Sequence, residues 1–470
     1  MRRSILPDRS GFFAMCACVA VAALAAAPVP ADAQSQGRSP APARGLEQRE
    51  ACSVTWASGS AGPPGAHLDR LGIRDAWRFA DGAGQTIAVI DTGVSPSSRL
   101  PQLSGGGDLV AGGDGLSDCD AHGTLIAGLI AAVPGADGFA GVAPGASLVS
   151  IRQSSAKFSR PRDATNPTTV ETPLGSGSEA GAGTLRTLAT AIDLAVDSGA
   201  RIINISEIAC VPAGTPLDDG PLHASIETAV LERDVAIVAA AGNIEGACAT
   251  GNPAFPGRGG PSSRDSLDAV QTLAVPAWYD ELVLTVGAVG REGEAAEFSL
   301  PGPWVDVAAP GEGLTSLGIR DPGADAVGGE LADAVVQPSG AAAPLEGTSF
   351  AAPLVAGLVA LIRERFPALT APQVYERITD TAVGRGDDLR IGAGIVDPLA
   401  ALTAPPGRLR AADPAPVAAS IPTGAAAQPA GTSTAAAIGA AAAIAVLGAG
   451  LFALLSRARL GSQTSKNGAA

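Results

Sequence analysis

Short apolar runs alternate with segments of helical length through the middle of the chain. Four of the runs are mostly apolar, as in strands that are buried on both faces of a sheet. Strands are predicted at residues 86–91, 147–151, 202–206, 235–240, 282–286 and 304–308, and helices at 123–132, 185–198, 223–232, 349–366 and 372–381. This alternation predicts an α/β fold with a mostly parallel central sheet covered by helices on both faces.

Two long polar segments rich in glycine interrupt this pattern, at residues 154–183 and 321–344. Loops of that length inside a compact domain are more often functional or mobile than neutral.

The N-terminus has the pattern of an export signal. Arg2 and Arg3 precede an apolar run at residues 12–27, and Ala31-Asp32-Ala33 supplies a small-x-small cleavage site. This order predicts a signal peptide at residues 1–33, and an uncleaved N-terminal anchor is the alternative. In both cases the following residues leave the cytoplasm.

A second apolar segment lies near the C-terminus. Residues 435–455 contain no charged side chain and are long enough to cross a bilayer, which takes about 20 residues. Arg457 and Arg459 follow at once, and positive flanks stay in the cytoplasm, so a tail at residues 456–470 is expected inside. Because the segment is rich in alanine, a buried or interfacial helix remains the alternative.

Three segments lie between the predicted signal peptide and the predicted membrane helix. A peptidase-sized domain at residues 68–400 is preceded by an extension at residues 34–67, and a Pro/Ala-rich linker at residues 401–434 joins it to the predicted membrane helix. The net charge of −15, without a cluster of Lys and Arg in the folded region, excludes a nucleic-acid partner.

Six cysteines occur, and two of them belong to the signal peptide. The other four form an even set in an exported protein, which predicts disulfides, and three pairings are possible. A metal site is the weaker interpretation because no two of the four form a Cys-x-x-Cys pair. The four are Cys52, Cys119, Cys210 and Cys248.

The chain has only three histidines, which limits the candidates for a catalytic base. His67 and His223 stand in ordinary contexts that favour surface or partly packed residues. His122 lies in Asp120-Ala-His122-Gly-Thr124, just before an apolar helix, where an imidazole can project from the helix start into a cleft. It becomes a candidate base only if an acid and a nucleophile accompany it.

The acid and the nucleophile have candidates in two further motifs. Asp91 lies at the carboxyl end of a buried strand, where open α/β folds collect functional groups. Asp-Thr-Gly is also a sequence that favours a turn, so a turn-forming role is the alternative. Ser349 opens an apolar helix, where it could simply be the N-cap, but helix N-terminal amides also stabilise an oxyanion. Asn243, after another buried strand, is a turn residue or a second oxyanion donor.

Chain order separates the classes of serine hydrolase. No histidine follows Ser349, which excludes the Ser…Asp…His order of α/β-hydrolases, and Asp91 precedes His122, unlike the order in chymotrypsin. The remaining order, Asp…His…Ser, is that of subtilisin.

The motifs resemble the signature blocks of subtilisin-like proteases: Asp91-Thr-Gly, His122-Gly-Thr, Ala-Ala-Gly-Asn243 and Gly-Thr-Ser349-x-Ala-Ala-Pro, in the right order from about residue 68 to 398. The resemblance is closer still to the mycosins, the membrane-anchored subtilases of type VII secretion systems. Asp118-Cys-Asp-Ala-His-Gly-Thr124 and Asn204-Ile-Ser-Glu-Ile-Ala-Cys210 support it. The resemblance implies a three-layer subtilisin-like fold.

The resemblance also assigns roles. Asp91, His122 and Ser349 would form the catalytic triad, with Asn243 and the Ser349 amide as the oxyanion hole. Ser206, Glu207 and Ile208 would pair with the substrate backbone as an added strand. It further implies that Cys52 joins Cys119, that Cys210 joins Cys248, and that the N-terminal extension wraps the catalytic domain. No acidic loop marks a calcium site, so neither a metal nor a cofactor is expected.

The function expected from this resemblance is that of a membrane-anchored serine endopeptidase that processes proteins exported by a type VII secretion system. Its partners would be a protein or peptide substrate, the membrane through a single span, and other membrane components of that system. The catalytic domain would lie outside the cytoplasm. The alternative is a structural stabiliser of the secretion complex in which proteolysis is secondary; a broad nutritional protease is disfavoured by the membrane tether.

Overall fold

The computed structural model describes residues 45–160, 181–254, 268–319, 331–336, 340–384 and 388–405. The predicted signal peptide, the predicted membrane helix at residues 435–455 and the predicted tail lie outside these ranges, as do most of the linker and the first part of the extension. Among the described residues, none of the helices combines the length and the apolar character that a membrane span requires.

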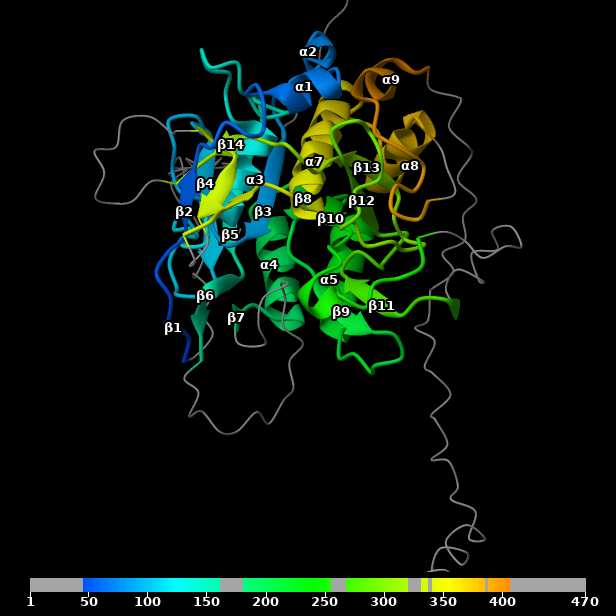
Figure 1. Cartoon of the computed structure of the whole chain (residues 1–470). Coiled ribbons are helices and arrows are strands. Elements are labelled where there is room, and N and C mark those ends of the chain that lie inside the picture. Colours follow the sequence, from blue (N-terminus) through cyan, green and yellow to red (C-terminus); the bar gives the residue numbers. More distant parts are fainter. Residues whose placement is uncertain are drawn as a thin grey trace, which may run out of the picture. The chain divides into compact units, whose positions relative to one another are not determined.

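A seven-stranded parallel sheet forms the centre of the fold (Figure 1). Its strand order is β13-β12-β10-β8-β3-β5-β4, and every residue of β8, β10, β12 and β13 is buried. The strands are β3 (Thr86–Asp91), β4 (Leu103–Asp108), β5 (Ser147–Arg152), β8 (Ile202–Ile205), β10 (Ala236–Ala240), β12 (Val283–Val289) and β13 (Val307–Pro310). Such burial requires cover on both faces of the sheet.

Two packed pairs of helices provide that cover. Helices α3 and α7 lie side by side against the sheet, and α4 packs with α5 (Figure 1). The helices are α1 (Ala66–Arg70), α2 (Ile73–Ala76), α3 (His122–Ala131), α4 (Leu185–Asp197), α5 (Gly220–Glu227), α7 (Thr348–Arg365), α8 (Ala371–Thr381) and α9 (Pro398–Thr403). Helix α7 is buried on nearly all sides, which explains why its sequence is apolar all round.

The structure confirms the six predicted strands as members of this parallel sheet, with bounds that differ by a few residues. Strand β4 was not predicted, because its sequence Leu-Ser-Gly-Gly-Gly-Asp has no apolar run; it lies at the sheet edge, where less burial is needed. The helix predicted at residues 223–232 is α5 followed by a π-helical turn, Thr228–Glu232.

Small sheets join the N-terminal segment to the two insertions. Strand β1 (Glu47–Gln48) pairs with β6 (Ser155–Ser159) of the first insertion, which also pairs with β7 (Gly181–Ala182). Strand β2 (Val54–Trp56) pairs with β16 (Ala334–Val336) of the second insertion, which in turn pairs with β17 (Ala342–Pro344). The described part of each insertion is therefore a partner for the N-terminal segment.

Two further strand pairs and two disulfides complete the described fold. Strand β9 (Ala209–Pro212) pairs with β11 (Thr272–Val275), and β14 (Ser316–Leu317) pairs with β15 (Leu331–Ala332). Cys52 is bonded to Cys119 and Cys210 to Cys248, the two pairs that the family resemblance implies.

Candidate active site

Asp91 and His122 meet at the carboxyl end of the central sheet. Asp91 is the last residue of β3 and is fully buried, and His122 is the first residue of α3. Asp91 Oδ1 lies 2.8 Å from His122 Nδ1 and also accepts a hydrogen bond of 2.7 Å from the Thr92 amide. This contact fixes the ring so that its other nitrogen, Nε2, is free to act on a second group.

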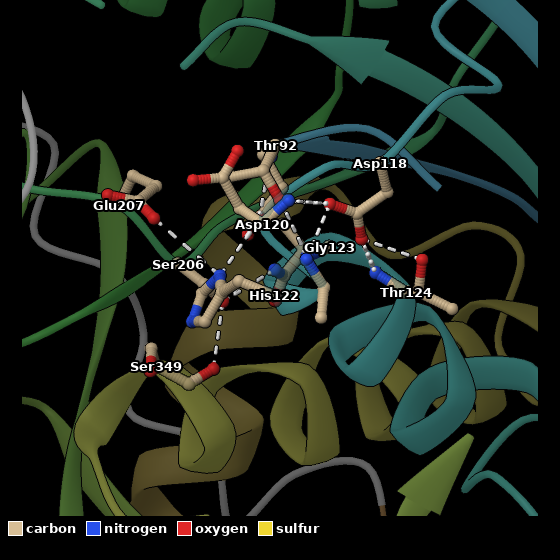
Figure 2. Close-up of polar contacts among 12 residues, drawn as sticks. Thr92, Asp118, Asp120, His122, Gly123, Thr124, Ser206, Glu207 and Ser349 are labelled. Atoms are coloured by element: carbon tan, nitrogen blue, oxygen red, sulfur yellow. Dashed lines mark hydrogen bonds and ion pairs between the residues drawn. The ribbon is translucent and has the colours of Figure 1, made fainter. Parts of the chain in front are cut away.

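Another carboxylate, that of Asp118, braces the start of α3 (Figure 2). It accepts hydrogen bonds from the amides of Ala121 and Thr124, at 2.9 Å each, and from the hydroxyls of Thr92 and Thr124. Ala121, directly before His122, has a φ of 71°, a region that residues other than glycine rarely adopt. Asp118 therefore holds a strained backbone at the point where the imidazole leaves the helix.

Close packing at the next residue has a similar effect. A Cβ atom at Gly123 would collide with the Gly93 carbonyl oxygen, and the Gly123 amide donates to the Thr92 hydroxyl at 3.0 Å. The loop after β3 and the start of α3 therefore touch through their backbones, and this contact fixes the position of His122 relative to Asp91.

We expect Asp118→Ala to lower the free energy of unfolding by about 3 kcal/mol, because several buried donors lose their acceptor together. Chemical denaturation of the two proteins measures the difference. Asp114→Ala is the matched control: its exposed carboxylate lies in the same loop and accepts only the Leu116 amide among the described contacts, so a change within about 0.5 kcal/mol is expected. Equal losses in both variants would contradict the bracing role of Asp118.

Ser349 lies at the start of α7, facing the His122 ring (Figure 2). Both residues line one cleft of about 220 Å³, and the ring of Phe350 packs at 5.5 Å from that of His122. Gly347 rather than Ser349 is the N-cap, and no side chain caps the helix. The Ser349 hydroxyl is thus available to the cleft, and the N-capping interpretation of this serine was wrong because the helix begins at Thr348.

The amide side chain of Asn243 is oriented toward the same cleft by Thr348. Asn243 Oδ1 accepts hydrogen bonds from the Thr348 amide and hydroxyl, each at 3.0 Å, and that hydroxyl accepts from the Gly242 amide. A Cβ atom at Gly347 would lie 3.1 Å from both Asn243 Nδ2 and Ser349 Oγ. These two groups therefore border one small space, together with the Ser349 amide, which intrahelical bonding leaves free.

The segment 206–208 forms another wall of the cleft. The Ser206 hydroxyl donates to the Ser349 carbonyl at 2.9 Å, and Ser206 and Ile208 are buried, whereas the Glu207 side chain reaches toward His122. This segment has no strand partner in the part of the chain that the structure describes. Six of the seven non-cysteine residues of the predicted site line this cleft, and the seventh, Asp91, is buried behind His122 in contact with its ring. The six are His122, Ser206, Glu207, Ile208, Asn243 and Ser349.

The sequence profile described as the subtilase family (Peptidase S8) matches residues 82–394. The chain belongs to the subtilase family. Mycosin-4 of Mycobacterium tuberculosis is 48% identical over 380 residues, which cover 78% of this chain and 77% of the relative. Within the family the chain is therefore similar to the mycosins, and it shares their assignment as serine proteases.

Solved structures agree with this assignment. The structure of the MycP3 protease from the type VII (ESX-3) secretion system is similar with a TM-score of 0.69 and 42% identity, covering 77% of this chain and 95% of that one. A chain in the structure of an intact ESX-5 inner membrane complex is similar with a TM-score of 0.69 and 34% identity, covering 89% of this chain and 96% of that one. The subtilisin-like fold of this chain, with its parallel central sheet, follows from these matches.

The charges around the imidazole of this subtilase favour its protonated form. Burial by itself lowers the pKa of His122, but Asp91, through its charge and its hydrogen bond, together with Glu207 and Asp118, raises that pKa above its ordinary value. An imidazolium that forms during a reaction is therefore stabilised in this site.

Two positions that support the site were not singled out from the sequence. Asp118 and Thr348 stand inside the motifs Asp118-Cys-Asp-Ala-His-Gly-Thr124 and Gly-Thr348-Ser349, so the motifs contain them, but only the structure shows what they hold. Asp91, His122 and Glu207 also have ligand atoms within 4.8 Å of one another, as a metal site would require. A metal at that point would displace the contact between His122 Nδ1 and Asp91 Oδ1.

The other two histidines lie away from this cleft. His67 is fully buried, with Nε2 at 3.1 Å from the Ala140 carbonyl oxygen, and burial lowers its pKa to about 4. The expectation of a surface or partly packed residue was wrong for His67, which belongs to the core. His223 is half exposed and lies against the edge of Tyr279, as expected for a surface residue.

Proposed function

We propose that Ser349 is the nucleophile of a serine endopeptidase, His122 its general base and acid, and Asp91 the carboxylate that orients His122. The observation that carries the proposal is the 2.8 Å contact between Asp91 and His122, which turns the free nitrogen of the ring toward the cleft that Ser349 lines. The order Asp…His…Ser and membership of the subtilase family support the same roles.

The reaction then follows from the positions of these groups. Ser349 Oγ attacks the peptide carbonyl, and His122 takes its proton and later gives it to the leaving amine. Asp91 stabilises the imidazolium formed in between. Asn243 Nδ2 and the Ser349 amide, which border one space, bind the oxyanion of the tetrahedral intermediate. Water hydrolyses the acyl-enzyme through the same groups.

The substrate main chain is proposed to lie along Ser206, Glu207 and Ile208. This segment lines the cleft and has no strand partner among the described residues, so an extended peptide can pair with its backbone. Recognition through the main chain suits an enzyme that cleaves within proteins.

The proposal is tested by Ser349→Ala in the full-length chain. We expect the wild type to be labelled stoichiometrically by a fluorescent fluorophosphonate, which reacts only with an activated serine, and the variant to be unlabelled. Ser198→Ala, which removes a hydroxyl at the C-cap of α4 that does not line the cleft, is the matched control and should keep its label. Labelling of the alanine variant at position 349 to the same extent would refute the assignment.

The cellular setting is proposed from the relatives and from the ends of the chain. A signal peptide at residues 1–33 would export the protein, and a helix at residues 435–455 would anchor it by a single span, with residues 68–400 outside the cytoplasm. The similar structures are named as components of type VII systems, one of them within an inner membrane complex. We propose that this chain works beside such a complex on exported proteins.

A structural role in that complex is the second candidate. The similarity to a chain of the ESX-5 inner membrane complex favours it, as does the N-terminal segment, whose strand β2 carries the exposed side chains Val54 and Trp56. Comparing secretion and the size of the detergent-extracted complex between wild type and Ser349→Ala separates the roles. If the variant keeps both, scaffolding is the main function; if it keeps the complex but loses secretion, proteolysis is the main function.

A further inference from the structure

Glu207 contributes a second carboxylate to the imidazole. Its Oε1 lies 3.6 Å from His122 Nδ1, the same nitrogen that contacts Asp91 at 2.8 Å (Figure 2). The side chain of Glu207 is 20% exposed, so most of its surface is removed from water. Among the described residues, the ion pair with His122 is the one polar contact that the structure gives to this carboxylate.

The position of Glu207 is set by its neighbours on both sides. The Ser206 hydroxyl accepts from Asn204 Nδ2 at 2.9 Å and donates to the Ser349 carbonyl, and Ile208 is buried. The backbone of Glu207 is thus anchored to β8 and to the start of α7. The carboxylate therefore contacts His122 from a backbone position that these hydrogen bonds hold in place.

The surrounding charges make this position unfavourable for an ionised Glu207 unless the imidazole of His122 is protonated. Besides His122, the titratable groups facing Glu207 are Asp91 from β3 and Asp120 from the loop before α3, and Glu245 and Glu346 line the same cleft. Lys and Arg are absent from the described lining of the cleft. Burial, with Asp91 and Asp120, raises the pKa of Glu207 to about 7, against the lowering effect of His122. Only a protonated His122 offsets the cost of keeping the Glu207 carboxylate charged among these acidic groups.

We propose that Glu207 is a positioning residue for the proteolytic reaction, which shares with Asp91 the stabilisation of the His122 imidazolium. The inference rests on the proposed function. Since the imidazolium appears when Ser349 loses its proton, a carboxylate that favours it lowers the barrier more than it stabilises the resting enzyme. The same carboxylate is an alternative acceptor for the Nδ1 proton when Asp91 cannot accept it.

A double-mutant cycle tests the proposal with the full-length chain in detergent and a fluorescent fluorophosphonate as the probe. The rate constant for labelling Ser349 is measured in wild type, Glu207→Gln, Asp91→Asn and the double variant. Loss of a triad carboxylate costs about 10⁴-fold in a serine protease that has one such group. Here we expect a smaller loss for Asp91→Asn, and we expect Glu207→Gln to slow labelling about tenfold more in the Asp91→Asn background than alone.

The pH profile supplies a readout that a merely structural role would not move. Removing a negative charge beside His122 lowers the pKa of the imidazole, so the acid limb of the labelling rate should shift to lower pH by about one unit in Glu207→Gln. Glu346→Gln removes the same charge elsewhere in the cleft and should shift the limb less. Glu207→Asp keeps the charge on a shorter side chain and should lie between wild type and the glutamine variant.

Three results would overturn the inference. These are an equal slowing by Glu207→Gln in both backgrounds, an unmoved acid limb, or an equal shift in Glu346→Gln. A wild type that is not labelled at Ser349 at all would instead overturn the proposed function, and this inference with it. Thermal melting of each variant shows whether a slow rate reflects a lost fold.

Discussion

Alanine at position 122 is expected to lower the turnover of a fluorogenic peptide by about a millionfold, the loss measured for the same change in subtilisin, a member of this family. His122 faces Ser349 across the cleft, and the ring is held by Asp91 at 2.8 Å, so it is the group placed to take the serine proton. The measurement is steady-state hydrolysis by the full-length variant at high enzyme concentration.

The matched control for this prediction is His223→Ala, since that exposed histidine pairs only with Glu227 and Tyr279 among the described contacts. It should keep wild-type turnover. Combining His122→Ala with Ser349→Ala should cost no more than either change alone, because the two groups act as a unit. A double variant that is slower by the product of the single losses would speak against a shared proton transfer.

Asn243→Ala is expected to lower kcat about a hundredfold to a thousandfold with little change in KM. This magnitude is the one known for an oxyanion-hole asparagine in subtilisin, and membership of the same family justifies its transfer to this chain. The physical reason is that, in the proposed mechanism, Nδ2 binds an oxygen that is charged only in the tetrahedral intermediate. Its orientation depends on Thr348, which holds the amide oxygen through two hydrogen bonds.

Thr348→Val tests that dependence. It removes one of the two hydrogen bonds to Asn243 Oδ1 and leaves the backbone amide in place, so kcat should fall by less than in Asn243→Ala. Steady-state kinetics of both variants distinguish the roles. If Asn243→Ala raised KM and left kcat unchanged, the side chain would bind the ground state of the substrate, and the oxyanion role would be excluded.

The sequence predicted the parallel sheet and the meeting of Asp91 with His122 because both depend on local signals. A buried strand that ends in Asp91 and a helix that begins at His122 each have a strong pattern, and parallel strands bring their carboxyl ends to one edge. Strand β4 lacks such a pattern: its three glycines fit the sheet edge only because β5 is already there to pair with.

The contacts of Glu207 and Asp118 could not be predicted in the same way. Glu207 follows β8, whereas His122 begins α3, the helix after β4, and these two strands are not neighbours in the sheet. Their approach to 3.6 Å therefore depends on how the segments after two separate strands pack. The motif around Asp118 was recognised, yet nothing in its letters distinguishes the carboxylate that braces the helix from Asp120, which instead accepts from Ser155 and Ala156. Such assignments need coordinates because they depend on side-chain direction.

Both crosslinks have an end close to a group that the reaction uses. Cys119 lies three positions before His122, Cys210 two positions after Ile208, and Cys248 five positions after Asn243. Bonds of this kind form and persist in oxidising compartments and are rare in the cytoplasm. Under the proposed export, the chain would carry these three parts of the cleft without covalent ties until translocation, and the two disulfides would secure the cleft only afterwards.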